Sequence, residues 1–343
     1  MLVREGTHSE MDLFIDSSFD DVYAQHPLVL VDVGARGGLK VNWLPAKRHL
    51  RVVGFEPDKR EFARLSDTHT DADTTTFFDV ALHNHREPIR LNIARDRGLT
   101  SVFEPDREFL DTFPAADRFD IVDVQQVDAD ALDNVLERGG VTDVDFLKVD
   151  TQGSELLVLQ GAERTLASSA VGVEVEAEFV PIYKGQPLFA DVDAYLRGLD
   201  YQLFDLRPVY WKRAVGRSVG GPRGQIVWAD ALYFKRLPAL QALCAQPGRP
   251  APKSKVLKAI SIALLYGYYD YALEILRNAG QWLQPGERAT IEQRIRQGGA
   301  RRSVLASLPG GRRLAAALRR LSRISVPPDD AWSFSRGRVG NDD

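Results

Sequence analysis

The sequence contains very little sulfur and no long apolar run. Its 343 residues include one cysteine, Cys244, and two methionines. A single cysteine excludes a disulfide within the chain and a thiolate metal cluster. The longest apolar run, residues 259–269, is too short to span a bilayer, and the first 16 residues lack the apolar core of a secretory signal. We therefore expect a soluble, cytoplasmic protein.

The first 250 residues carry more acidic than basic side chains. Residues 251–343 carry 16 Lys and Arg against 8 Asp and Glu, whereas the first 250 residues carry 28 against 40. An acidic body repels phosphates, so nucleic acid is not an expected partner. The apolar fraction of 44% is ordinary for a globular chain with one large or two modest domains, and a homo-oligomer is compatible with it.

Short apolar runs alternate with helix-like segments through the first two thirds of the chain. Strand patterns precede helical patterns over 154–168, with Ser154 as the expected cap, and over 189–199. This alternation predicts an α/β fold with a parallel sheet covered on both faces. The strands are expected over 28–33, 50–56, 75–82, 144–150, 171–179 and 201–206, with an antiparallel strand over 224–236.

Two segments break this rhythm. Residues 83–127 look like an antiparallel excursion from the main sheet, and the Pro and Lys content of 246–255 indicates a linker. We predict four units along the chain. They are an N-terminal helical segment (1–27), the α/β domain (28–237), an all-helical extension (250–325) and a disordered tail (326–343).

Three glycines, Gly34, Gly37 and Gly38, follow the first strand within five residues. A glycine-rich turn at that place holds a nucleotide-like ligand in open α/β sheets, because glycine lets the backbone approach the ligand. The dinucleotide fingerprint needs glycine where Arg36 stands, and no phosphate-loop lysine follows. Asp32, just before the turn, would repel a pyrophosphate but suits a cation. We therefore predict S-adenosylmethionine, which carries a sulfonium and an ammonium group and no phosphate.

The second strand supports this prediction. It ends at Glu56, 24 residues past Asp32, where an acid can accept both hydroxyls of a ribose. The alternative is a plain strand–helix–strand unit in which both acids only cap turns.

The fourth strand offers groups for chemistry. Lys148 and Asp150 share one strand face, as do Glu174 and Glu176 on the next strand. Asp150 is the first choice for a general base and Glu176 the second, while a structural ion network is the competing interpretation. We predict no metal, although two such acids could hold Mg²⁺. His83 and His85 lack partners at ligand spacing and are interpreted as surface residues.

Seven motifs carry a resemblance to a known family. In order they are "VDVGARGG", "GFEPD", "VALHN", "GLTSVF", "DFLKVDTQGSELLVLQGA", "EVEAEFVPIYKGQPLFADVDAYL" and "WADALYFKR". With them the chain resembles FkbM-type methyltransferases, class I enzymes that depend on S-adenosylmethionine. The resemblance spans about 28–236 and leaves 240–343 uncovered. It implies a Rossmann-like sheet of seven strands with the last antiparallel, and O-methylation of a sugar, glycan or natural product.

Lys148, Asp150 and Glu176 are the residues that the strand-end pattern offers for catalysis. The resemblance implies roles for further residues. Arg36 is unusual in such a turn, and we expect it to point toward Asp32, Asp150 or an anionic acceptor. The implied cofactor contacts are Asp32, Gly34, Arg36, Gly38, Glu56, Pro57, Asp79, Val80, Ala81 and Ser101. Asp79 is the candidate for the adenine amino group.

The C-terminal part predicts a basic amphipathic helix over 310–324. Such a helix can rest on an anionic membrane or on an acidic partner. Because its apolar stripe is rich in alanine, we favour docking on the acidic body or on a partner over membrane contact. Two other functions stay open at this point: a nicotinamide-dependent oxidoreductase, and a non-catalytic Rossmann scaffold that binds partners through the helical tail.

Overall fold

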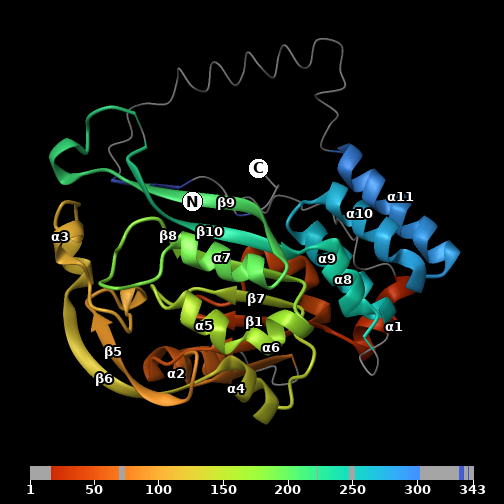
Figure 1. Cartoon of the computed structure of the whole chain (residues 1–343), viewed down its shortest axis with the longest axis horizontal. Helices are drawn as coiled ribbons and strands as arrows, with labels where there is room; N and C mark the ends of the chain where they lie inside the picture. Colours follow the sequence, from red (N-terminus) through yellow and green to blue (C-terminus); the bar gives the residue numbers. More distant parts are fainter. Residues whose placement is uncertain are drawn as a thin grey trace.

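The main sheet of the computed structural model has eight strands (Figure 1). The structure describes residues 17–68, 74–221, 223–246, 252–301, 332–335 and 339. The strand order is β11-β9-β10-β8-β7-β1-β2-β3. The bounds are β1 (Leu28–Val33), β2 (Leu50–Phe55), β3 (Thr75–Phe78), β7 (Phe146–Val149), β8 (Gly172–Glu178), β9 (Tyr201–Trp211), β10 (Gln225–Lys235) and β11 (Ser333–Ser335).

Seven of these strands confirm the expected Rossmann-like sheet. Strands β3, β2, β1, β7 and β8 pair in parallel, and β10 is antiparallel to both β8 and β9. The eighth strand corrects the sequence analysis, which placed Ser333–Ser335 in a disordered tail. These residues form β11 and pair antiparallel with β9, which gives the exposed edge of the sheet a partner.

One face of the sheet is covered by helices that follow its own strands (Figure 1). These are α4 (Leu132–Arg138), α5 (Glu155–Gly161), α6 (Glu163–Ser168) and α7 (Phe189–Gly198). Alternate residues of the strands point into this layer, including Val31, Leu147 and Val175, each 0% exposed. Together they form one continuous apolar core, as the near-unbroken aliphatic strands predict.

The opposite face is covered by helices from the C-terminal third. They are α8 (Leu237–Cys244), α9 (Pro252–Leu265), α10 (Tyr269–Ala279) and α11 (Pro285–Arg301), joined by α1 (Ser17–Gln25). Phe146 and Leu232 of the sheet share a core with Ile262 and Tyr266. The predicted helical extension is therefore part of the same packed body over its described residues. The basic segment 310–324 lies outside the described residues.

Four buried charges hold α9 against the sheet. Lys255 Nζ lies 2.5 Å from Asp145 and 2.7 Å from Asp143, and Lys258 Nζ lies 2.9 Å from Asp145. The interpretation of 246–255 as a linker was wrong for its last four residues, because α9 begins at Pro252 and Lys255 is buried. The Pro and Lys content that indicated a linker instead reflects a helix start and an ion-paired anchor.

Residues 83–127 contribute to a second sheet, as expected. It has the order β4-β6-β5, with β4 (Ala81–Leu82), β5 (Glu87–Ala94) and β6 (Ile121–Asp130). The remaining elements are α2 (Lys59–Thr68), α3 (Arg107–Leu110) and the 3₁₀ segments η1 (Val41–His49), η2 (Arg97–Leu99), η3 (Ala116–Phe119), η4 (Ala214–Gly216) and η5 (Gly280–Trp282). Among the described helices, none is both long enough and apolar enough to cross a bilayer.

Candidate functional site

A cavity of about 300 Å³ opens at the carboxyl ends of the parallel strands. Gly34 and Arg36 line it after β1, Glu56 and Pro57 after β2, and Asp150 after β7. Val80 and Ala81 form part of its wall. Ligands of open α/β sheets bind at this edge, so the structure brings most of the predicted residues to the expected place.

Gly34 has a different reason to be glycine from the one that the sequence suggests. Its φ is +73°, and an added Cβ would lie 2.0 Å from the carbonyl oxygen of Asp150. The residue is therefore required by the close packing of the ends of β1 and β7. Gly37 also has a positive φ, +88°, with open space around the position of a Cβ. The turn thus owes its glycines to backbone geometry as well as to any ligand.

Glu56 presents a buried carboxylate to the cavity. One oxygen, Oε1, accepts a hydrogen bond of 2.9 Å from the amide of Asp58. Burial raises the pKa of Glu56 to about 7, against the opposing effects of that hydrogen bond and of Arg36. With one oxygen held by the backbone, the other is available to ribose hydroxyls, which fits the role predicted from the sequence.

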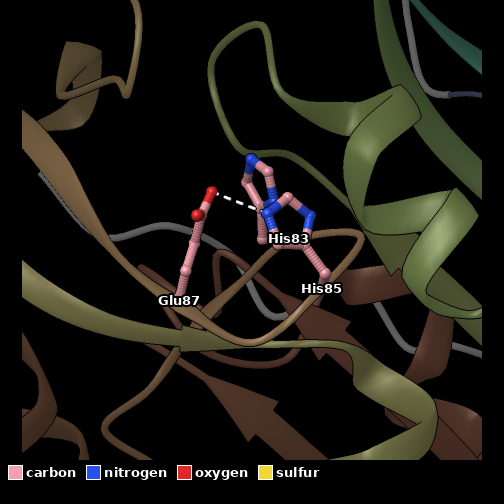
Figure 2. Close-up of side chains that lie close together, drawn as sticks. All are labelled: His83, His85 and Glu87. Atoms are coloured by element: carbon pink, nitrogen blue, oxygen red, sulfur yellow. Dashed lines mark ion pairs between the residues drawn. The ribbon is translucent and has the colours of Figure 1, made fainter.

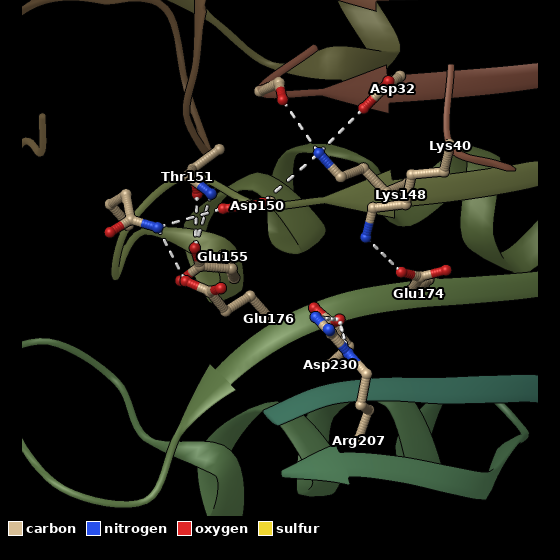
Figure 3. Close-up of polar contacts among 12 residues, drawn as sticks. Asp32, Lys40, Lys148, Asp150, Thr151, Glu155, Glu174, Glu176, Arg207 and Asp230 are labelled. Atoms are coloured by element: carbon tan, nitrogen blue, oxygen red, sulfur yellow. Dashed lines mark hydrogen bonds and ion pairs between the residues drawn. The ribbon is translucent and has the colours of Figure 1, made fainter. Parts of the chain in front are cut away.

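Lys148 stands at the centre of a charged network (Figure 3). Its Nζ lies 3.2 Å from Asp32 and 3.7 Å from Asp150, and it donates a 3.0 Å hydrogen bond to the carbonyl of Gly34. Burial opposes the charged form of Lys148, but Asp32 and then Asp150 raise its pKa above the ordinary value. For Asp32, burial outweighs the ion pair and raises the pKa of the carboxyl. The cation at Asp32 and Asp150 is thus Lys148 rather than Arg36.

Gln152 joins the two candidate bases, a role that the sequence analysis missed. Its Nε2 donates to Asp150 at 3.3 Å and to Glu176 at 2.8 Å, while its Oε1 accepts from the Tyr183 hydroxyl at 3.0 Å. Its backbone has φ +58°, a conformation that costs a non-glycine residue energy. The only signal in the sequence is its position before a glycine, directly after the fourth predicted strand.

The buried acids beside this loop have displaced pKa values. Burial, followed by Asp150, raises the pKa of Glu176 well above its usual range. Glu155 accepts hydrogen bonds from the amides of Thr151 and Gly153, and burial raises its pKa to about 7. Ser154 stands at the N-cap position of α5, as expected, but its side chain makes no capping hydrogen bond with any described residue. Glu155 shapes the loop instead.

Several predicted residues lie away from the 300 Å³ cavity. Asp32 and Gly38 line a neighbouring cavity of about 520 Å³. Asp79 is exposed and lies outside the described residues that line either cavity. Ser101 is buried, and its hydroxyl donates a 2.6 Å hydrogen bond to the carbonyl of Gln152. Ser101 therefore supports the loop that contains Gln152, while its neighbour Thr100 lines the cavity.

Residues 32–203, about half of the chain, match the family model described as methyltransferase FkbM domain. The chain belongs to the FkbM methyltransferase family. This assignment confirms the resemblance to S-adenosylmethionine-dependent methyltransferases and contradicts the oxidoreductase alternative. No curated protein sequence is significantly similar to the chain.

The solved structures that match this FkbM methyltransferase are distant from it. A methyltransferase FkbM from Methylobacillus flagellatus is 18% identical with a TM-score of 0.36, over 61% of this chain and 43% of that one. A SAM-dependent methyltransferase from Anabaena variabilis is 10% identical with a TM-score of 0.30, over 64% and 83%. The chain thus matches less than half the length of the Methylobacillus protein.

Proposed function

We propose that this FkbM methyltransferase methylates a hydroxyl oxygen of a sugar, glycan or natural product. The observation that carries the proposal is the position of Asp150. Its carboxylate lines the cavity, its side chain is 34% exposed, and Lys148 and Gln152 orient it from two sides. A sugar hydroxyl is a poor nucleophile until its proton leaves, so a positioned carboxylate is the group that this chemistry needs.

The residues present fit S-adenosylmethionine. The cavity offers carboxylates at Glu56 and Asp150 and has no phosphate-binding lysine among the described residues that line it. Glu56 would hold the ribose hydroxyls, and the acids near the β7 end suit the positive charge of the sulfonium and ammonium groups. When bound, the cofactor supplies a methyl carbon activated by the sulfonium.

Asp150 is the better base of the two candidates. The raised pKa of Glu176 favours its protonated form, which cannot accept a proton. Asp150 lies 3.7 Å from Lys148 and lines the cavity, whereas Glu176 is not among the described residues that line it. In the proposed step the acceptor oxygen forms a bond to the methyl carbon, the carbon–sulfur bond breaks, and the hydroxyl proton passes to Asp150. Lys148 positions that carboxylate directly, and Glu176 positions it through Gln152.

The test is methyl transfer from S-adenosylmethionine with a trideuterated methyl group to fractionated sugars, glycans and small metabolites. Mass spectrometry with fragmentation should locate the label on an oxygen. Label on nitrogen or carbon, or none with any fraction although the cofactor binds in calorimetry, would overturn the proposal. The exposed variant Asp128→Asn serves as a control that should transfer the label like the native protein.

A further inference from the structure

The turn between β4 and β5 gathers two imidazoles and a carboxylate outside the cofactor cavity (Figure 2). The ligand atoms of His83, His85 and Glu87 all lie within 4.8 Å of one another. The two rings meet edge to face with centroids 4.8 Å apart. The sequence analysis saw no carboxylate partner for the histidines, but the start of β5 brings Glu87 to them.

The hydrogen bonds of His85 point its free nitrogen at Glu87. Asn84 donates from Nδ2 to Gln160 at 3.1 Å, which orients the amide, and its Oδ1 contacts His85 Nδ1. An amide oxygen can only accept, so Nδ1 carries the proton. In the neutral ring Nε2 then holds a lone pair 2.7 Å from Glu87 Oε1. Two acceptors repel at that distance unless a proton or a metal ion lies between them.

His83 contributes a second, more buried nitrogen. Its Nδ1 is inaccessible and has no hydrogen-bond partner among the described residues. An imidazole nitrogen with a free lone pair is the donor that binds a metal ion.

The backbone of this turn is already held in place. The amide of His83 donates a 3.0 Å hydrogen bond to the carbonyl of Asp130 on β6. On the other side, the carbonyl of His83 packs so closely on Gly161 that a Cβ there would lie 2.1 Å away. The side chains therefore project from a fixed frame, and the amide of Asn84 supports His85 as outer partners support metal ligands.

We propose that His83, His85 and Glu87 bind one divalent transition-metal ion of the zinc class, with water as the fourth ligand. Two nitrogens and one carboxylate oxygen form a common zinc donor set. Ligands at about 2.1 Å from a tetrahedral ion are about 3.4 Å apart, so closing from 4.8 Å takes small side-chain rotations. Because Ala81 and Leu82 of β4 line the cofactor cavity, the ion would brace the wall of that cavity.

Calorimetric titration of the metal-free full chain with ZnCl₂ tests the proposal. We expect one ion per chain, and a loss of affinity of at least about tenfold in His83→Gln, His85→Gln and Glu87→Gln, as for removal of a ligand. The matched control is His26→Gln, a partly exposed histidine outside the turn, which should bind like the native chain. Cys244 is buried and cannot substitute as a ligand.

Cobalt gives an independent readout, since tetrahedral Co²⁺ absorbs visible light strongly. The native chain and the His26→Gln variant should develop this absorption, and the three turn variants should not. Melting curves recorded without metal should show that the half-exposed His85 and Glu87 variants remain folded. Absence of binding in the native chain, or equal binding by folded turn variants, would overturn the proposal and identify the His85–Glu87 contact as an imidazolium–carboxylate pair.

Discussion

The two faces of the central sheet differ in what covers them and in how their residues change along the strands. The face under α4 to α7 is apolar along the strands except at Lys235 of β10, whose ammonium group donates to the carbonyls of Leu166 and Leu199. The opposite face is apolar only where α9 and α10 cover it, with Leu30 and Phe146 inside. One step further along the same strands stand Asp32 and Lys148. The charges of the candidate site thus lie beyond the part of this face that α9 and α10 cover.

This difference shows how one sheet can carry both an apolar core and a charged candidate site. Polar residues in a fully covered layer would need partners for every buried atom. On the opposite face several charges are paired with a charge from another element. Lys40 contacts Glu174 at 2.5 Å, and Arg207 donates to Asp230 at 2.7 Å (Figure 3). The predictions below test this division, beginning with the largest expected effect.

Replacing Lys255 by Met should lower the free energy of unfolding by about 3–5 kcal/mol, because removing one partner of a buried ion pair leaves the other uncompensated. Asp143 and Asp145 would then share only Lys258. Urea denaturation measures the change, and the exposed Lys59→Met is the matched control. A loss as small as in the control would mean that α9 is only loosely attached.

The cores on the two faces should respond alike to truncation. Leu159→Ala on α5 and Ile262→Ala on α9 each remove a fully buried side chain, so each should cost about 2–5 kcal/mol. Both variants should unfold in a single transition when followed by circular dichroism and tryptophan fluorescence. A separate early transition in Ile262→Ala alone would show that the C-terminal helices fold as an independent unit.

At the charged end of the second face, Asp150→Asn should lower turnover by at least about 100-fold, as loss of a general base does. Cofactor affinity should change only a few-fold, because the amide keeps the shape of the side chain. Turnover is measured as the rate of S-adenosylhomocysteine formation with the acceptor that the native protein methylates. Cofactor affinity is measured by calorimetry. Undiminished turnover would remove Asp150 from the base role.

The smallest effect concerns Glu56, whose pKa of about 7 makes cofactor binding depend on pH. Ribose hydroxyls donate to the ionised carboxylate, so affinity should rise about tenfold between pH 6 and pH 8. For the cofactor-free fold the sign is opposite. The raised pKa contributes stability below the ordinary value of 4.5, and this is lost as pH rises through about 7.

Calorimetry of S-adenosylmethionine binding at several pH values checks this prediction. The Glu56→Gln variant should bind more weakly and lose the pH dependence. A native pH profile in the variant would contradict the assignment of Glu56 to the ribose.

Local patterns predicted most of the fold. The first strand was predicted at its observed bounds, Leu28–Val33, since five aliphatic residues bounded by a turn leave little choice. The same patterns failed where a residue's partner is remote. Ser333–Ser335 was assigned to disorder although β9 pairs with it. Composition shows nothing of a partner more than 100 residues away.

The amino-acid pattern by itself determined the alternating architecture, the family and the acids at the strand ends, because these depend on periodicity and on motifs within short stretches. Only the tertiary structure decided which charges meet. Lys148 reaches Asp32 because β7 lies beside β1, and Gln152 links Asp150 to Glu176 because β8 follows on the other side. Strand order and the helices that cover each face set those contacts, and they arise from the packing of the whole chain.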